Sequence, residues 1–266
     1  MGTLKVSNAQ LYYEESGSGE PLVLIPGFAS GAWSWSWQFD ALAKNFRVVT
    51  FDPRGIARST IAAGEAVSIP SISDDTVGIL DKLELERAHI LGISFGGFVA
   101  LDLALRYRDR VDKLVLASTS FGGPNHVAPS MQVLAAFANT EGLNTSERIR
   151  KYLTVSFSPE FVETNSETVE RFCQLREENS VPQDVYMQQL QAALNFNVEK
   201  EVGKIRAETL VVTGDQDAVV PAQNSQNLAA AIPTSRLEFI RSTGHMAFVE
   251  RADEFNRLVA EFLKKD

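Results

Sequence analysis

The chain has 266 residues, of which 44% are hydrophobic and 22% are charged, and this composition supports one large globular domain. The net charge of −9, without a block of lysine or arginine, argues against a nucleic-acid surface, because phosphate binding needs a concentrated positive field. The single cysteine, Cys173, cannot form an internal disulfide, and no CxxC or Cys/His cluster suits zinc. We therefore interpret Cys173 as a small core residue and expect neither a metal nor a cofactor.

The chain shows no targeting or membrane signal. Residues 1–17 lack a basic region followed by an apolar stretch, and nowhere do about 18 apolar residues run together. We expect a cytoplasmic protein that binds a small-molecule substrate and has no nucleic-acid or membrane partner. Monomer and homodimer both remain open.

In chain order, the first predicted elements are two strands at 3–8 and 9–16, where alternating apolar and polar residues indicate antiparallel edge strands. Later strands are richer in Val, Ile and Leu, as expected when helices cover both faces of a sheet. These strands are predicted at 21–27, 46–52, 88–94, 112–118, 208–214 and 236–240. Helical patterns separate them, at 37–45, 71–85 and 95–109. This alternation predicts an α/β fold with a mostly parallel sheet of about eight strands and helices on both faces.

The alternation stops between about residues 121 and 203. Four amphipathic helical stretches fill this segment, at 130–142, 147–157, 166–179 and 182–196. Because the strand pattern resumes afterwards, the sequence predicts a helical cap at 121–203, inserted into a core made of 1–120 and 204–266.

One serine stands where a strand pattern gives way to a helical pattern. Residues 92–96, GISFG, fit the nucleophile-elbow pattern G-x-S-x-G, in which a strained turn displays the serine hydroxyl. In a parallel sheet, the carboxyl ends of the strands carry the site. Ser94 is therefore a candidate nucleophile, with a serine in a tight structural turn as the alternative.

A nucleophilic serine needs a base and a group that orients the base. His89 begins its predicted strand, at the wrong end of the sheet, and His126 lies in a loop rich in Gly and Pro. His245 instead follows the strand at 236–240, where a turn at the carboxyl edge is expected.

Two aspartates follow the predicted strand at 208–214. Asp217 is the candidate acid, since the resulting order of serine, acid and histidine along the chain is a known one for such triads. We interpret Asp215 as a short polar side chain that stabilises the turn backbone.

Five motifs cover nearly the whole chain in order: PLVLIPGFASGAW, FDPRGIARS, GISFGG, GDQDAVVP and GHMAFVE. In these motifs the sequence resembles the α/β-hydrolase fold family, especially its small capped bacterial esterases, lactonases and C–C hydrolases. The resemblance implies that Ser94 is the nucleophile, Asp217 the orienting acid and His245 the general base. It also implies an oxyanion hole formed by the backbone N–H groups of Phe28 and Phe95.

Two positions depart from the family pattern. Pro26 stands where many relatives have histidine, which leaves the backbone donor of the oxyanion loop intact, and Ala57 replaces a usual glycine, so its turn is expected to differ slightly. Asp52, Arg54 and Ser59 of the same motif are interpreted as a structural brace of the loop.

Apolar residues near these motifs and in the cap are candidates for the substrate pocket. They are Trp33, Phe121, Met131, Phe157, Val219 and Met246. Core packing is the alternative, and we favour it for at least two of the three tryptophans. No arginine is placed by a motif to hold a substrate carboxylate.

These patterns lead us to expect a serine hydrolase that cleaves a carboxylic ester or lactone of a small, largely apolar substrate through an acyl-enzyme. Alternatives are a C–C bond hydrolase of meta-cleavage diketones, perhydrolase or haloperoxidase chemistry, and a ligand-binding regulator with slow turnover. Dehalogenase chemistry is disfavoured, since that branch needs an aspartate where Ser94 stands.

Overall fold

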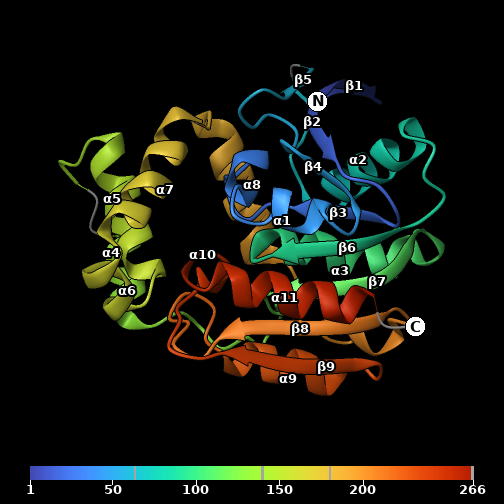
Figure 1. Cartoon of the computed structure of the whole chain (residues 1–266). Coiled ribbons are helices and arrows are strands. Elements are labelled where there is room, and N and C mark those ends of the chain that lie inside the picture. Colours follow the sequence, from blue (N-terminus) through green and yellow to red (C-terminus); the bar gives the residue numbers. More distant parts are fainter. Residues whose placement is uncertain (63, 139–140, 180, 265–266) are drawn as a thin grey trace.

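A nine-stranded sheet forms the centre of the computed structural model, which describes residues 1–62, 64–138, 141–179 and 181–264 (Figure 1). Its strands follow the order β1-β2-β4-β3-β6-β7-β8-β9, and β5 pairs with β2. All pairings from β4 to β9 are parallel, whereas β2 is antiparallel to each of its partners. The predicted α/β class and mostly parallel sheet are confirmed.

The strand bounds agree closely with the predicted runs. The strands are β1 (Gly2–Val6), β2 (Ala9–Ser16), β3 (Pro21–Ile25), β4 (Arg47–Phe51), β5 (Thr60–Ile61), β6 (Ala88–Ile93), β7 (Val111–Ala117), β8 (Glu208–Gly214) and β9 (Ser235–Ile240). The unpredicted strand is β5, whose two residues are too few to show alternation. The prediction of two edge strands is wrong for β2, which lies between β1 and β4.

Helices cover both faces of the sheet because successive strand residues point to opposite sides. Along β3, Val23 and Ile25 belong to one hydrophobic core, and Leu22 and Leu24 belong to the other. The first core includes residues of α2 (Ile69–Lys82), α3 (Phe95–Arg106) and α9 (Gln223–Ala231). The second includes residues of α1 (Phe39–Ala43), α10 (Ala247–Glu250) and α11 (Ala252–Leu263). Short 3-10 turns occupy Ala32–Trp35, Arg108–Arg110 and Val202–Lys204.

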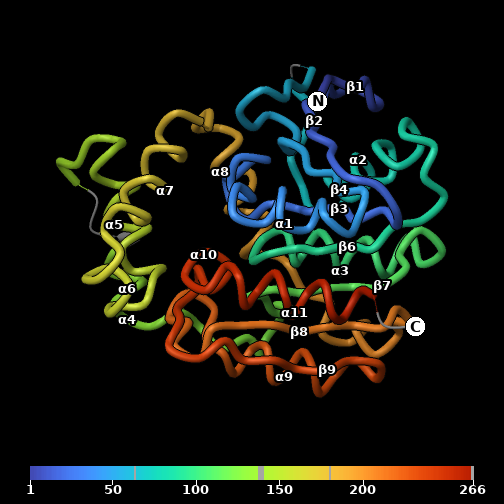
Figure 2. The backbone as a smooth tube through the Cα atoms, in the orientation of Figure 1, coloured from blue at the N-terminus to red at the C-terminus, as the bar shows by residue number. Residues whose placement is uncertain are grey.

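Between β7 and β8 the chain leaves the sheet and forms a group of helices, here called the cap. Its helices within the described ranges are α4 (Met131–Ala138), α5 (Thr145–Ser156), α6 (Pro159–Thr164), α7 (Ser166–Glu178) and α8 (Gln183–Asn195). Figure 2 shows this excursion beyond the end of the sheet to which β8 and β9 point, which is the carboxyl edge. Residues 139 and 140 of the predicted helix 130–142 lie outside the described residues.

The cap contains one helix that the hydrophobic pattern did not predict. The six residues of α6 are too few to show a clear helical period, but their start carries a helix signal. The Ser158 hydroxyl accepts a hydrogen bond from the Phe161 amide, and Pro159 occupies the first turn. None of the helices in the described part of the chain is long and apolar enough to cross a membrane.

The loop after β4 is braced as predicted. An Asp52 carboxylate oxygen accepts from the Ala32 amide at 2.8 Å, and the Ser59 hydroxyl donates to the Asp52 carbonyl at 2.6 Å. Arg54 forms two 2.7 Å hydrogen bonds with buried Asp75 on α2. Ala57 lies in the left-handed region at φ 47°, so alanine occupies a turn conformation that favours glycine.

Candidate active site

Ser94 lies at the junction of β6 and α3 in a strained backbone conformation. Its φ of 53° and ψ of −117° fall outside the regions that non-glycine residues normally adopt. The junction is also very close-packed: a Cβ at Gly92 would lie 2.2 Å from the Gly96 carbonyl oxygen, and one at Gly96 would lie 2.3 Å from that of Ile25. The two glycines therefore permit a turn so tight that the serine projects from the end of the strand.

His245 and Asp217 come together from the loops after β9 and β8. The His245 Nδ1 and an Asp217 Oδ2 atom are 2.8 Å apart, and both side chains are buried. The other oxygen, Oδ1, accepts hydrogen bonds from the amides of Val219 at 2.9 Å and Val220 at 2.8 Å. A carboxylate only accepts hydrogen bonds, so Nδ1 is the donor in this contact, and in the neutral imidazole Nε2 is then the acceptor.

Asp215 has the turn role that the sequence indicated. Its carboxylate accepts a hydrogen bond from the Ser242 amide at 2.7 Å and faces Arg241 at 3.5 Å. Asp215 thus joins the loops after β8 and β9, and Asp217 is the aspartate that contacts the histidine.

Ser94 and His245 line one cavity between the core and the cap. From the core, Gly27, Phe28 and Met246 also line it. The cap contributes Tyr152, Leu153, Phe172 and Arg176. A serine hydroxyl and an imidazole thus share a partly apolar space in which a small ligand would meet both.

Of the predicted pocket residues, Met246 lines this cavity. Five others lie outside its lining: Trp33, Phe121, Met131, Phe157 and Val219. Met131 is 80% exposed, and the other four are buried in packed clusters. Trp33, for example, packs edge-on against Phe172 at 5.3 Å between ring centroids. Apolar character near a motif does not tell which face a side chain uses, and most such residues fill the core.

The two predicted oxyanion amides belong to the residue after Ser94 and to the loop after β3. Phe95 is the first residue of α3, so its N–H has no acceptor within the helix. Phe28 lines the cavity on the loop after β3. The next residue, Ala29, has φ 50° and donates its amide to Gln189 Oε1 on α8 at 2.7 Å. Sequence reasoning missed Gln189, because only the folded chain brings residues 160 positions apart into contact.

Arg176 and Tyr152, two polar side chains of the cap that line the cavity, were not predicted from the sequence, because no motif marks them. Burial lowers the pKa of Arg176 to about 10, partly offset by Tyr152 and Tyr186. Burial raises the pKa of Tyr152 to about 12. At neutral pH the cavity is thus lined by a cationic guanidinium and a neutral phenol.

Glu250 on α10 holds the histidine loop against the cap. Its Oε1 accepts from the amides of Gly244 at 2.9 Å and Ser158 at 3.1 Å, and its Oε2 accepts from the Ser158 hydroxyl at 2.5 Å. Burial raises the pKa of Glu250 despite these hydrogen bonds. One carboxylate therefore fixes the residue before His245 and the start of α6 together.

The other two histidines lie away from the cavity. His126 Nδ1 is 3.1 Å from the Ser120 hydroxyl, and burial lowers its pKa. His89 is near the start of β6, at the end of the sheet opposite Ser94, as predicted.

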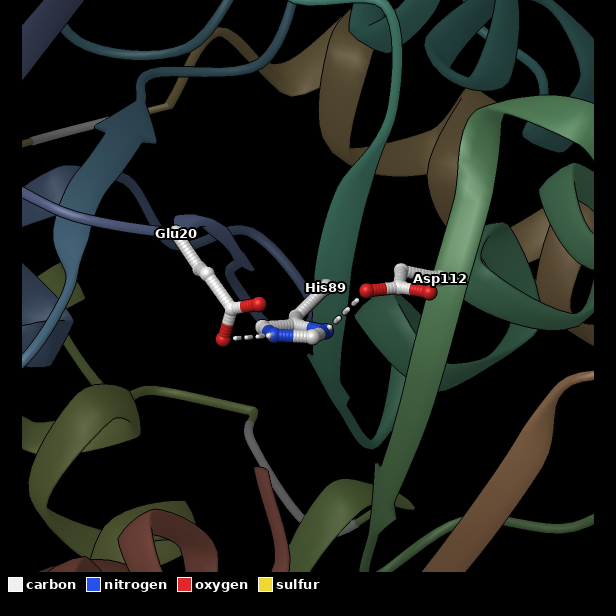
Figure 3. Close-up of side chains that lie close together, drawn as sticks. All are labelled: Glu20, His89 and Asp112. Atoms are coloured by element: carbon white, nitrogen blue, oxygen red, sulfur yellow. Dashed lines mark hydrogen bonds and ion pairs between the residues drawn. The ribbon is translucent and has the colours of Figure 1, made fainter. Parts of the chain in front are cut away.

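His89 belongs to a cluster with Glu20 and Asp112 (Figure 3). Its Nε2 is 3.4 Å from Glu20 and its Nδ1 is 3.4 Å from Asp112, so each ring nitrogen faces its own carboxylate. The nitrogens of one imidazole point in diverging directions, and one ion cannot bind both. Asp112 is also paired with Arg87 at 2.5 Å. We interpret the cluster as a polar network that satisfies a buried histidine.

Comparison with known proteins shows that the chain is similar to hydrolases. A family model described as alpha/beta hydrolase fold matches residues 20–252. The chain is 32% identical over 271 residues to 2-hydroxy-6-oxononadienedioate/2-hydroxy-6-oxononatrienedioate hydrolase 1 of Pseudomonas putida, with 95% of this chain and 91% of the relative covered. It is 28% identical over 271 residues to 2-hydroxy-6-oxo-6-phenylhexa-2,4-dienoate hydrolase of Comamonas testosteroni, with coverages of 98% and 93%.

A solved structure that is named for another activity is also similar to this chain. The enol-lactonase from Burkholderia xenovorans LB400 superposes with a TM-score of 0.86 at 26% identity, and the match covers 99% of this chain and 100% of the enol-lactonase. Proteins similar to this chain are therefore named for different substrates and activities.

Proposed function

Because the chain belongs to the alpha/beta hydrolase family and is a hydrolase, we propose that it cleaves a carboxylic ester or lactone through an acyl-enzyme formed on Ser94. The observation that carries this proposal is the shared cavity of Ser94 and His245, with His245 held by Asp217 at 2.8 Å. A nucleophile, a base and a group that orients the base are the parts that acyl transfer requires.

Each group has a defined task in this mechanism. Ser94 Oγ attacks the substrate carbonyl while His245 Nε2 takes the hydroxyl proton. Asp217 stabilises the resulting imidazolium, and the amides of Phe28 and Phe95 donate to the developing oxyanion. The imidazolium then protonates the leaving alcohol. A water molecule, deprotonated by His245, attacks the acyl-enzyme; the imidazolium then returns the proton to Ser94 Oγ as the acid is released.

The strained elbow supports this assignment over a structural turn. A positive φ at a non-glycine residue costs of order 1–3 kcal/mol, and such strain persists where the surrounding structure fixes it, commonly at active sites. A serine that served only as a turn residue would be more stable as glycine at this φ. The cavity in front of Ser94 gives the displayed hydroxyl a place to react.

The test is hydrolysis of p-nitrophenyl esters from acetate to decanoate and of several lactones, with wild type and Ser94→Ala compared. We expect kcat/KM for the substrates that are turned over to fall by at least about 10³-fold in Ser94→Ala. Circular dichroism and the unfolding midpoint check that the variant is folded. Full turnover by folded Ser94→Ala would overturn the proposal.

A second candidate is hydrolysis of a carbon–carbon bond in a meta-cleavage diketone acid. It is favoured by the names of the relatives from P. putida and C. testosteroni, which the chain matches over nearly its whole length. Turnover of such a diketone with a higher kcat/KM than any ester or lactone of the panel would select this candidate. The opposite ranking would select the ester or lactone.

A further inference from the structure

The strand β9 forms one edge of the sheet. Among the described residues it pairs only with β8, so no strand lies on its outer side (Figure 1). An edge strand presents a row of backbone N–H and C=O groups that no neighbouring strand satisfies. The outer side of β9 is therefore a place where a further strand can extend the sheet.

Two charged side chains lie along this edge. Arg236 and Glu238 are on the same face of β9, because residues two positions apart in a strand point to the same side. The Arg236 guanidinium carbon is 5.0 Å from the ring centroid of Phe262 on α11. Its Nε atom is buried without an acceptor, and neither Arg236 nor Glu238 forms an ion pair with any of the described residues. Since buried donors are normally paired, this edge lacks an acceptor.

A second copy of the chain would bring the same strand to this edge. When a two-fold axis perpendicular to the sheet relates two identical edge strands, the strands run antiparallel and the contacts are reciprocal. With the axis at Leu237, Arg236 of each copy lies opposite Glu238 of the other. An axis at Arg236 or at Glu238 would instead place like charges opposite each other. Charge complementarity therefore selects the register that is centred on Leu237.

We propose that two copies of the chain pair through β9, antiparallel and centred on Leu237, and so form a homodimer with one continuous sheet. Side chains directly opposite each other in such a pair have Cβ atoms about 4.5–5.5 Å apart, within reach of arginine and glutamate. Each Glu238 supplies the acceptor that Nε of Arg236 lacks. On the other face, the partly buried Leu237 meets its symmetry mate and extends the first hydrophobic core.

Two observations on other strands support this choice. The sheet already contains a cross-strand ion pair of this kind, since Lys113 on β7 is the register partner of Glu208 on β8 and their charged atoms are 3.9 Å apart. The opposite edge strand, β1, has one base, Lys5, and no acid in its sequence GTLKV. The charge pattern thus favours β9 over β1 as the surface that binds a second copy.

Sedimentation velocity tests the association directly. Six residues of β9 bury little area, so we expect a weak dimer with a dissociation constant in the micromolar range. Wild type at about 1 to 200 µM should therefore shift from monomer to dimer as its concentration rises. A wild type that stays monomeric over the whole range would overturn the proposal. The interface lies outside the cavity of Ser94 and His245, so this test is independent of the reaction catalysed.

Charge reversal tests the register. Arg236→Glu places two acids opposite each other, and Glu238→Arg places two bases opposite each other. Each change affects two symmetric pairs, so each should raise the dissociation constant at least about 10-fold. The double variant restores opposite charges across the interface and should regain most of the wild-type affinity. Because misfolding cannot produce such a recovery, the double variant also controls for folding.

Two further variants control for net charge. Arg108→Glu and Glu163→Arg make the same charge changes at exposed positions outside β9, and they should leave the dissociation constant unchanged. A dimer that both single reversals at β9 leave intact would overturn the proposal. A double variant that binds no more tightly than the single variants would overturn it as well.

Hydrogen exchange locates the interface. In wild type, the backbone amides of residues 235–240 should exchange more slowly at the highest protein concentration than at the lowest, because pairing protects the outer N–H groups of β9. The single reversals should remove this concentration dependence. Equal exchange of these amides at both concentrations, in a protein that does dimerise, would place the interface elsewhere and contradict the proposal.

Discussion

At the scale of single residues, two aspartates separated by one position have different surroundings. The Asp217 carboxylate contacts His245 and two loop amides, whereas Asp215 contacts the Ser242 amide. Replacing the acid by its amide leaves the shape intact but allows the imidazole to take the wrong tautomer. The same replacement at Asp215 provides a matched control, because Asp215 does not contact His245.

Asp217→Asn is expected to lower kcat by about 10⁴-fold, because Nδ1 of His245 would no longer be held as a donor. Asp215→Asn should change kcat less than about threefold, since its contacts support the turn. Steady-state kinetics of both variants on one ester measure the contrast. Comparable losses in the two variants would contradict the assignment of Asp217.

Gln189 contacts the loop that contains Phe28, one of the two amides proposed for the oxyanion hole. Its fully buried Oε1 accepts from Ala29, the residue after Phe28, and helps hold Ala29 at positive φ. In Gln189→Leu that buried amide loses its acceptor, which costs about 1–3 kcal/mol and frees the loop. We expect kcat to fall about 10-fold or more with a smaller change in KM.

The adjacent Gln188 supplies a control for the Gln189 prediction. Gln188 accepts a hydrogen bond from the Val67 amide at 2.8 Å, in the segment just before α2 and not in the loop after β3. Gln188→Leu should therefore lower the free energy of unfolding without a matching fall in kcat. If the two leucine variants lose kcat equally, Gln189 acts through general stability of the cap and not through the loop.

At the scale of elements, α10 connects the histidine loop to the cap through Glu250. Glu250→Ala would leave the amides of Gly244 and Ser158 without their acceptor, at a cost of about 2–4 kcal/mol in the free energy of unfolding. Glu250→Gln keeps one carbonyl acceptor, so its free energy of unfolding should fall clearly less than that of Glu250→Ala. Urea unfolding at neutral pH measures both, and equal losses would show that the acceptor is unimportant.

The raised pKa of Glu250 adds a pH dependence to this comparison. Its folded pKa lies above the ordinary carboxyl value, so the folded state binds a proton more tightly than the unfolded state. The contribution of Glu250 to the free energy of unfolding of wild type therefore falls as the pH rises from the ordinary carboxyl pKa to above the raised pKa of the folded state. Glu250→Gln lacks this titration, so its stability relative to wild type should increase across that window.

The core elements were predictable because their signals are local. Continuous apolar runs predicted the parallel strands, and the G-x-S-x-G pattern predicted the strand-to-helix turn at Ser94. The two-residue β5 and the six-residue α6 were missed, since periodicity needs several turns or alternations. Local signals thus defined the scaffold and the order of its motifs.

The lining of the cavity could not be predicted in the same way. Met131 and Trp33 are both apolar residues that the sequence placed in the pocket, yet one faces solvent and the other the core, because tertiary packing decides which side chains are covered. Arg176 and Gln189 carry no motif, and their roles depend on contacts between the cap and the core. Their contacts could therefore be seen only in the folded chain.

At the scale of the whole molecule, the core and the cap contribute different groups to one cavity. Ser94, His245 and the loop after β3 lie at the carboxyl edge of the sheet, and Tyr152, Phe172 and Arg176 belong to helices of the cap. Under the proposed function, the core supplies the groups for acyl transfer, and the cap completes the cavity in which the substrate binds. Changes in the cap should alter substrate preference more than the reaction catalysed.

The most direct test of the central claim is covalent titration with diethyl p-nitrophenyl phosphate, whose phosphoryl group gives a stable adduct on an activated serine. We expect stoichiometric release of p-nitrophenol, a proportional loss of ester turnover, and a diethylphosphoryl group on the peptide that contains Ser94. Ser94→Ala should release none. Ester turnover that persists in fully labelled protein, or inactivation with the label on another residue, would contradict Ser94 as the nucleophile.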